Sequence, residues 1–292
     1  MFAKLLNELT LTFKLRNEGP LLINSGTTAK IMPRTDMSFV RTMRDGAETI
    51  YIPGSSIKGV FRTRYEQIMR ALGQDVCDTF DYKDSRTCNK KIRIQENKPE
   101  VRKHLNGAER YALCCEACKL FGTLVLGGRI TFADAYPVGE WKMGIRNGVG
   151  IDRITGAAFP GALYEIEALE AGTFAVRCKM TNFKLYQLRT IIWVLEDINE
   201  GLVTFGMGGS RGNGQMRIAG GGGSSRDDGG DRGEDVELVY RKFADCAPNL
   251  FGEESDALFG KQVRITGLSE IIASININTK DELIAAIKSE VA

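Results

Sequence analysis

The most regular alternation of apolar and polar residues lies near the start of the chain. From Leu9 to Arg16 the apolar positions recur every second residue, which predicts a strand with one buried face. Residues 127–137 and 173–182 are also predicted to form strands. A turn-rich segment at 144–170, which alternates again over 162–169, predicts a protruding β-hairpin.

Helical periodicity is clear in two segments. The sequence from Ile52 to Gly59 predicts a turn into a helix that is capped by Ser55 or Ser56. The apolar stripe of this helix consists of Ile57, Phe61, Ile68 and Leu72. A second helix is predicted at 185–200, with Gly201 just beyond its end. Its buried stripe consists of Leu188, Ile191, Ile192, Leu195 and Ile198.

Long insertions separate these elements. Residues 21–51 are polar and irregular and predict a long basic loop, and an insertion at about 73–122 carries most of the cysteines. Residues 220–235 have the composition of a flexible linker. They lead to a small acidic extension at 236–292, which is short for an independent domain. Within it, strands are predicted at 236–240 and 263–265 and a helix at 281–290.

Composition and charge narrow the classes of protein. An apolar content of 43% is sufficient for a packed core. Because no apolar run approaches the roughly 20 residues of a membrane span and the start does not resemble a signal peptide, we expect a cytoplasmic protein with no membrane partner. Residues 1–219 carry 31 Lys and Arg against 23 Asp and Glu, net +8, whereas 220–292 carry 8 against 14, net −6. A basic body of this kind suits a polyanion partner.

A second glycine-rich run extends from Gly201 to Ile218. Glycines here can adopt positive φ and turn successive N–H groups toward an anion, and an arginine in the run adds donors for phosphate oxygens. An ordinary glycine-rich hairpin or linker is the alternative. The run is neither a Walker A loop nor a dinucleotide fingerprint, because a strand follows it. The phosphate-binding candidates are Gly208, Gly209, Ser210, Arg211 and Gly212.

The start of the first predicted helix is a second candidate phosphate site. A helix N-terminus attracts anions, and two hydroxyl groups and two basic side chains lie within its first turns. The alternative is a solvated basic face. The candidates are Ser55, Ser56, Lys58 and Arg62.

Four cysteines have the spacing of a structural zinc site. Cys115 and Cys118 form a Cys-x2-Cys knuckle, and Cys77 and Cys88 lie upstream in a polar segment. Two alternatives remain: a ligand set that uses Cys114 or His104, and ordinary buried thiols. The single histidine excludes a His–His acid/base pair, and no nucleophile elbow is present. Two strand–helix–strand units with basic loops therefore favour a ferredoxin-like, RNA-binding α+β fold over a conventional enzyme.

Three motifs in this order resemble the RAMP superfamily of CRISPR-associated proteins, specifically the backbone subunits of type III effector complexes. They are Ile52 to Gly59 with its helix, Gly150 to Gly156, and the glycine-rich run from Phe205 to Gly214. Within that superfamily, the group with a CxxC-Leu-Phe-Gly block is similar at Cys115 to Gly122, and its loop motif is similar at Thr35 to Val40. The resemblance covers residues 1–219 and not the extension.

The resemblance implies a fold and a set of partners. We expect a ferredoxin-like or RRM-like palm and a hairpin thumb at about 144–170 that inserts into a guide–target duplex. Copies or paralogues of the fold would stack along a CRISPR guide RNA, with a large polymerase/cyclase-type subunit, small helical subunits and target RNA as further partners. The thumb residues matching the motif are Ile151, Asp152 and Ile154, and Arg153 is expected to contact RNA.

The resemblance also implies a catalytic residue. In family members that cleave target RNA, an aspartate in the loop after the first strand promotes cleavage, and Asp36 is at the matching position. The carboxylate itself, or a bound Mg²⁺ or Mn²⁺, would assist attack of a 2′-OH on the adjacent phosphate. A loop carboxylate paired with Arg34 or Arg41 is the alternative. At the level of function, the alternatives are a purely architectural guide-binding subunit and an endoribonuclease that processes guide RNA.

Overall fold

The computed structural model describes residues 4–24, 26, 35–78, 87–97, 104–219, 236–257 and 260–291. The predicted linker at 220–235 and Arg34 lie outside the described residues. The strands are β1 (Asn7–Asn17), β2 (Arg41–Arg44), β3 (Ala47–Ile50), β4 (Ile130–Phe132), β5 (Tyr136–Pro137), β6 (Lys142–Ile151), β7 (Ala158–Ala171), β8 (Thr173–Thr181), β9 (Met216–Ile218), β10 (Val236–Lys242), β11 (Glu253–Ala257) and β12 (Gly260–Thr266). The helices are α1 (Gly54–Ala71), α2 (Cys88–Glu96), α3 (Gly107–Ala112), α4 (Glu116–Phe121), α5 (Leu185–Asn199), α6 (Leu268–Ile275) and α7 (Lys280–Val291).

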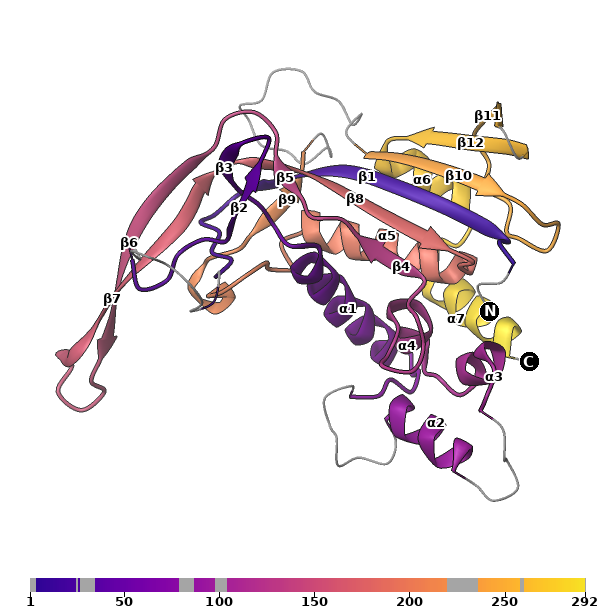
Figure 1. Cartoon of the computed structure of the whole chain (residues 1–292), viewed down its shortest axis with the longest axis horizontal. Coiled ribbons are helices and arrows are strands. Elements are labelled where there is room, and N and C mark those ends of the chain that lie inside the picture. Colours follow the sequence, from indigo (N-terminus) through magenta and orange to yellow (C-terminus); the bar gives the residue numbers. More distant parts are fainter. Residues whose placement is uncertain are drawn as a thin grey trace.

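The main sheet is antiparallel and is built on β1 (Figure 1). Its strand order is β11-β12-β10-β1-β8-β4, with β9 also paired to β1 and β5 to β8. The side chains of β1 alternate as the sequence predicts, because Leu9, Leu11, Phe13 and Leu15 are buried and the residues between them are not. Along residues 1–219 the element order β1-α1-β4-β8-α5-β9 gives a mixed α+β fold.

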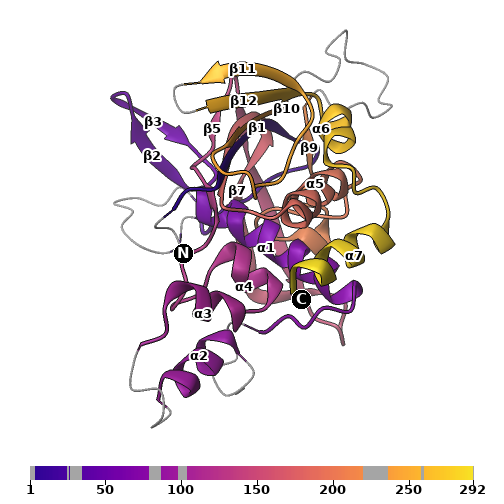
Figure 2. The same ribbon diagram turned by 90° about the vertical axis from the view of Figure 1, so that its right-hand side faces the viewer.

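Helices cover one face of this sheet (Figures 1 and 2). The apolar stripe of α1 packs on it, with the Phe61 ring 4.8 Å from that of Phe132 and 6.3 Å from that of Phe13. The five residues of the predicted α5 stripe are all buried in the same core. At the end of α5, Gly201 has φ 74°, its N–H donates to Ile198, and the N–H of Leu202 donates to Asp197. This is the Schellman arrangement for a glycine just beyond a helix.

Two hairpins extend from the sheet (Figure 1). The predicted one is present as β6 and β7, and it projects well beyond the sheet. The prediction of one long loop over 21–51 is wrong at its end, where β2 and β3 form the second hairpin. Its turn is Asp45-Gly46, with φ 53° and 80°. An Asp-Gly pair readily adopts positive φ, so the signal for this hairpin is present in the sequence.

The last part of the chain continues the main sheet. β10 pairs with β1 from Asn7 to Phe13 and carries β12 and β11 outward. Helix α6, which the sequence analysis did not predict, packs beneath these strands, and its Ile271 and Ile275 join the common core. Within the described residues, no helix is long and apolar enough to cross a membrane.

The predicted cap of the first helix needs correction. Helix α1 begins at Gly54 after Pro53, and neither Ser55 nor Ser56 caps it; the Gly54 N–H instead donates to the Asp134 carboxylate at 2.8 Å. The Asp134 carboxylate therefore takes the capping role that the sequence analysis assigned to a serine hydroxyl. The insertion after α1 contains short helices between its loops: α2 starts from the cap Thr87, and α3 starts from a capping box of Asn106 and Glu109.

Candidate nucleic-acid interface and metal centre

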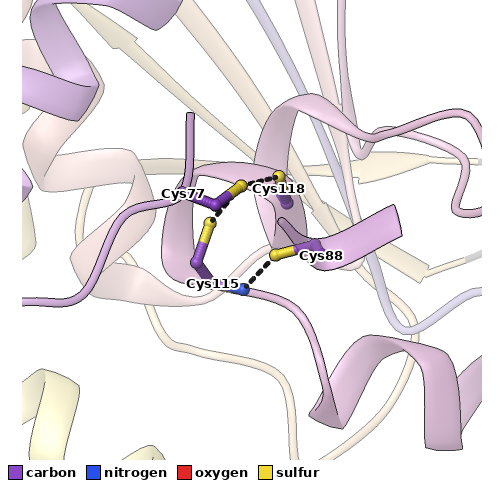
Figure 3. A group of neighbouring side chains, drawn as sticks. All are labelled: Cys77, Cys88, Cys115 and Cys118. Carbon is purple, nitrogen blue, oxygen red and sulfur yellow. Dashed lines mark hydrogen bonds between the residues drawn. The ribbon is translucent and has the colours of Figure 1, made fainter. Parts of the chain in front are cut away.

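Four cysteines from separate parts of the insertion meet in one cluster (Figure 3). Cys77 follows α1, Cys88 opens α2, and Cys115 and Cys118 lie at the start of α4 and within it. All four sulfur atoms lie within 4.8 Å of one another. The set that the Cys-x2-Cys spacing predicted is therefore brought together by the fold.

The cluster has the dimensions of a tetrathiolate metal site. The sulfur of Cys77 is 3.5 Å from that of Cys118 and 3.7 Å from that of Cys115. A tetrahedron with Zn–S bonds of about 2.3 Å has sulfur–sulfur edges of roughly 3.8 Å. The backbone N–H of Cys115 also donates to the Cys88 sulfur at 3.1 Å, which stabilises a thiolate ligand. The four side chains can hold a metal ion.

Hydrogen bonds among the thiols shift their pKa values. Hydrogen bonding with Cys115 lowers the pKa of Cys77 to about 7, and hydrogen bonding with Cys118 lowers the pKa of Cys115 to about 7. A hydrogen bond with Cys114 lowers the pKa of Cys88 to about 3. The hydrogen bond with Cys115 raises the pKa of Cys118, so the four thiols share protons and only some are thiolates, the metal-binding form.

The alternative ligands lie outside this set. Cys114 is buried beside the cluster and acts on Cys88 as a hydrogen-bond partner, whereas His104 is exposed. Arg62 on α1 approaches the cluster from the sheet side. Its guanidinium donates to the Cys118 sulfur at 3.5 Å, to the Gly122 carbonyl at 3.2 Å and to the Glu66 carboxylate at 2.8 Å. Arg62 therefore contacts the cysteine cluster directly.

Lys58 lies one turn before Arg62 on α1. Burial, and then the charge of Arg62, lowers the pKa of Lys58. Both side chains line a hollow of about 360 Å³ beside the glycine-containing loop that follows α4. Ser55 and Ser56 lie in the first turn of α1, where the Asp134 carboxylate already accepts from the Gly54 N–H. Of the four residues predicted at this helix start, the two serines therefore lie at the helix terminus, and Lys58 and Arg62 line the hollow near the cysteine cluster.

Asp36 lies beside the middle of the β6–β7 hairpin, where Glu165 pairs with Asn147. Its side chain is exposed, and its Oδ2 accepts a hydrogen bond from the backbone N–H of Glu165 on β7 at 2.8 Å. The next residue, Met37, pairs with the same strand. Arg41, an alternative partner for Asp36, is paired with Glu48 and Glu167 instead. Asp36 is thus fixed by the hairpin.

The glycine run folds into an ordered loop. Gly208 and Gly212 have φ 79° and 80° and enclose a short 3₁₀ turn at Gly209–Arg211. Gly206 and Gly214 allow close backbone contact, since a Cβ on Gly206 would collide with the Leu22 carbonyl and one on Gly214 with that of Phe205. The N–H of Gly214 also donates to the Pro20 carbonyl at 2.7 Å. The loop is packed against the segment after β1.

The glycine loop reaches the same strand as Asp36. Arg211 donates to the phenol oxygen of Tyr164 at 2.9 Å, and Tyr164 directly precedes Glu165 on β7. The Tyr164 ring lies across Gly148 of β6, where a Cβ would collide with it. Two loops that are distant in sequence therefore contact consecutive residues near the middle of the hairpin.

The predicted thumb residues form the exposed tip of this hairpin. Ile151 is 57% exposed and Ile154 95% exposed, and Arg153 lies in the turn between them. Asp152 shapes the turn, because its carboxylate accepts from the Ile154 N–H at 2.9 Å and from the Thr155 hydroxyl at 3.0 Å. The hydrogen bond from Ile154 is the main cause that lowers the pKa of Asp152.

Sequence reasoning missed Tyr164, Glu165 and Gly148. No motif marked them, because their importance depends on which distant loops contact β7. The glycine within the predicted strand was a usable signal, since a strand glycine often marks a place where another group approaches closely.

These features define a mixed α+β protein with an antiparallel sheet, a projecting hairpin and a cysteine cluster able to hold a metal. The family model of the RAMP superfamily matches residues 14–217, so the chain belongs to the RAMP superfamily. Proteins of this superfamily act in CRISPR complexes with RNA and other subunits, and some are ribonucleases. No curated protein matches the chain.

Proposed function

We propose that this protein is a guide-RNA-binding backbone subunit of a type III CRISPR complex and that it cleaves bound target RNA through Asp36. In this proposal residues 1–219 form the RNA-binding domain. The strand order β9-β1-β8-β4, with α1 after β1 and α5 after β8, supports a ferredoxin-like palm. The hairpin β6–β7 is the thumb. The observation that carries the proposal is that Asp36 and Arg211 contact consecutive residues of this hairpin.

The glycine loop is proposed to hold the guide backbone. In its 3₁₀ turn the N–H of Arg211 donates to Gly208 and that of Gly212 to Gly209. The first N–H groups of such a turn, here those of Gly209 and Ser210, have no acceptor within it and are suited to phosphate oxygens. Arg211 is held by Tyr164, so its guanidinium is already positioned when RNA arrives.

The thumb is proposed to separate the reacting nucleotide from its neighbours. Its tip presents Ile151 and Ile154, apolar side chains that can wedge between bases, and Arg153 for a phosphate. A nucleotide displaced beside Tyr164 and Glu165 would bring its 2′-OH toward the adjacent phosphate. The Asp36 carboxylate can accept the hydroxyl proton while the 2′-oxygen attacks phosphorus and the 5′-oxygen of the next nucleotide leaves with a proton from solvent. A divalent cation at Asp36 stays a prediction from the family resemblance.

Zinc is the metal proposed for the four cysteines. A closed set of four thiolates and no carboxylate suits Zn²⁺ in a structural role and disfavours Mg²⁺, which binds oxygen ligands. Cys77, Cys88, Cys115 and Cys118 would hold the ion and fix α2 and α4 to each other.

Substitution of Asp36 in the assembled complex tests the catalytic role. Asp36→Asn keeps an oxygen that can accept from Glu165 and removes the charge, so the contact with the hairpin stays in place. We expect target cleavage to fall at least about 100-fold, the usual contribution of a general base, while guide and target binding stay unchanged. The matched control is Asp245→Asn, an exposed aspartate after β10.

Two results would each assign a different function to the protein. If Asp36→Asn cleaves as fast as the parent, the carboxylate serves the hairpin and the subunit is architectural. If the isolated protein cuts precursor guide RNA, it is instead a processing nuclease.

A further inference from the structure

The face of the main sheet that carries no helix is strongly basic. Strand alternation and register assign its side chains, because direct partners on neighbouring antiparallel strands point to the same face. No described helix packs there, since α1, α4, α5 and α6 share the core on the opposite face. The basic side chains on this face are Lys14, Arg16, Arg177, Lys179, Arg217, Arg241 and Arg264, and the acidic ones are Glu8, Glu237 and Glu253, with Glu18 just beyond β1 paired to Arg16 and Arg217.

Ion pairs account for part of this charge. Lys179 is 2.9 Å from the Glu8 carboxylate, and Arg264 is 3.2 Å from that of Glu237. Arg177 is exposed and forms no ion pair with any described residue. An excess of positive charge therefore remains near the middle of β1 and β8, where the sheet is also hollowed.

The hollow has a volume of about 500 Å³ and combines cations with aromatic rings. Lys14, Arg177 and Arg44 line it together with Tyr136, and the carboxylates of Asp134 and Glu237 also lie in its wall. Both carboxylates already have partners, the Gly54 N–H for Asp134 and Arg264 for Glu237. The Arg44 guanidinium lies 4.1 Å from the centre of the Tyr136 ring, and Tyr51 stacks on Tyr136 with ring centres 6.0 Å apart. The β2–β3 hairpin thus brings an arginine and a tyrosine to the rim of the sheet. An open surface that combines basic and aromatic side chains is suited to binding the phosphates and the bases of a single-stranded nucleic acid.

We propose that this face, centred on the hollow, binds a single-stranded segment of RNA outside the guide cradle formed by the glycine loop and the hairpin. The inference rests on the proposed RNA-binding function and extends it to a second surface. Arg44 and Arg177 bind phosphates, and Tyr136 with Tyr51 supplies a flat apolar edge for a base. The occupant is nucleic acid because the face joins cations to aromatic rings and lacks a large apolar patch of the kind that docks a protein.

Binding of a fluorescent oligouridine to the full-length protein, measured over a range of salt concentrations, tests this surface. We expect Arg44→Glu/Arg177→Glu to weaken binding at least tenfold and to reduce the salt slope by about 1.4, the value for two phosphate contacts on a single strand. The matched control is Arg93→Glu/Lys288→Glu, exposed cations on α2 and α7, which should change the affinity less than about twofold. The neutral pair Arg44→Gln/Arg177→Gln, with circular dichroism melting, shows whether a loss reflects unfolding.

A second measurement locates the RNA directly. Oligonucleotides that contain 4-thiouridine should crosslink to Tyr136 or Tyr51, as identified by mass spectrometry. Crosslinks confined to the glycine loop and the hairpin would overturn the inference.

Comparison with Arg211→Gln in the glycine loop separates the two proposals. If Arg211→Gln weakens binding and both sheet-face variants do not, the second surface is wrong and the proposed function stands. If none of them weakens binding, both proposals are wrong. If the sheet-face variants bind RNA normally but lose self-association by light scattering, the face docks protein and the inference is also overturned.

Discussion

Arg62 shows how the surroundings of one residue decide its role. Its position one turn after Lys58 predicted a phosphate contact, yet its guanidinium is directed to Cys118, Glu66 and the Gly122 carbonyl. A cation that donates to a ligand sulfur lowers the negative charge of a tetrathiolate site and orients the ligand. Groups that donate hydrogen bonds to metal ligands contribute about 10- to 100-fold to metal affinity.

We therefore predict that Arg62→Ala weakens zinc binding about 10- to 100-fold, measured by competition with a chromophoric chelator. The control is Arg70→Ala, on the same helix, which also pairs with Glu66 but has no described contact with a cysteine. Equal zinc affinities for the two variants would show that Arg62 does not support the centre.

At the scale of elements, the sequence predicted those with a strong period and missed those that depend on distant contacts. The alternation of β1 and the apolar stripes of α1 and α5 correspond to buried faces. The cysteine set was predictable because thiol spacing constrains a tetrahedral site. The contact between Asp36 and Glu165 was not predictable, because nothing in either segment alone specifies which strand the other contacts.

The proposed zinc site at the four cysteines can be tested by metal content and thermal stability. We predict about one zinc per chain in the parent protein, and loss of the metal in Cys118→Ser with a melting temperature about 5 to 10 °C lower, as for a loss of about 2–3 kcal/mol. Cys114→Ser should keep its zinc, because Cys114 lies beside the ligand set and not within it. Elemental analysis and thermal melting measure both. A folded, metal-free parent would exclude a zinc role.

At the scale of the whole molecule, the charge division at Ala219 does not coincide with a division of the sheet. The acidic extension supplies β10, which pairs with β1 from Asn7 to Phe13, and its apolar residues belong to the core that also contains α1 and α5. The family match covers residues 14–217, so it contains neither β10 nor the β1 residues that pair with it. Removal of the extension would leave this edge of β1 unpaired, and an exposed central strand promotes aggregation.

Because the extension and residues 1–219 share one sheet and one core, we predict that they unfold together. Leu238 of β10 is fully buried, whereas its neighbour Val239 lies on the opposite, helix-free face. Leu238→Ala should destabilise the whole protein by about 2–5 kcal/mol, the cost of a large cavity in a core, and Val239→Ala by less than about 1 kcal/mol. Calorimetry should show one transition that moves as a unit in Leu238→Ala. A second transition that moves alone would mean that residues 236–292 fold as a separate domain, because only then can the loss of a core side chain leave β1, α1 and α5 unaffected.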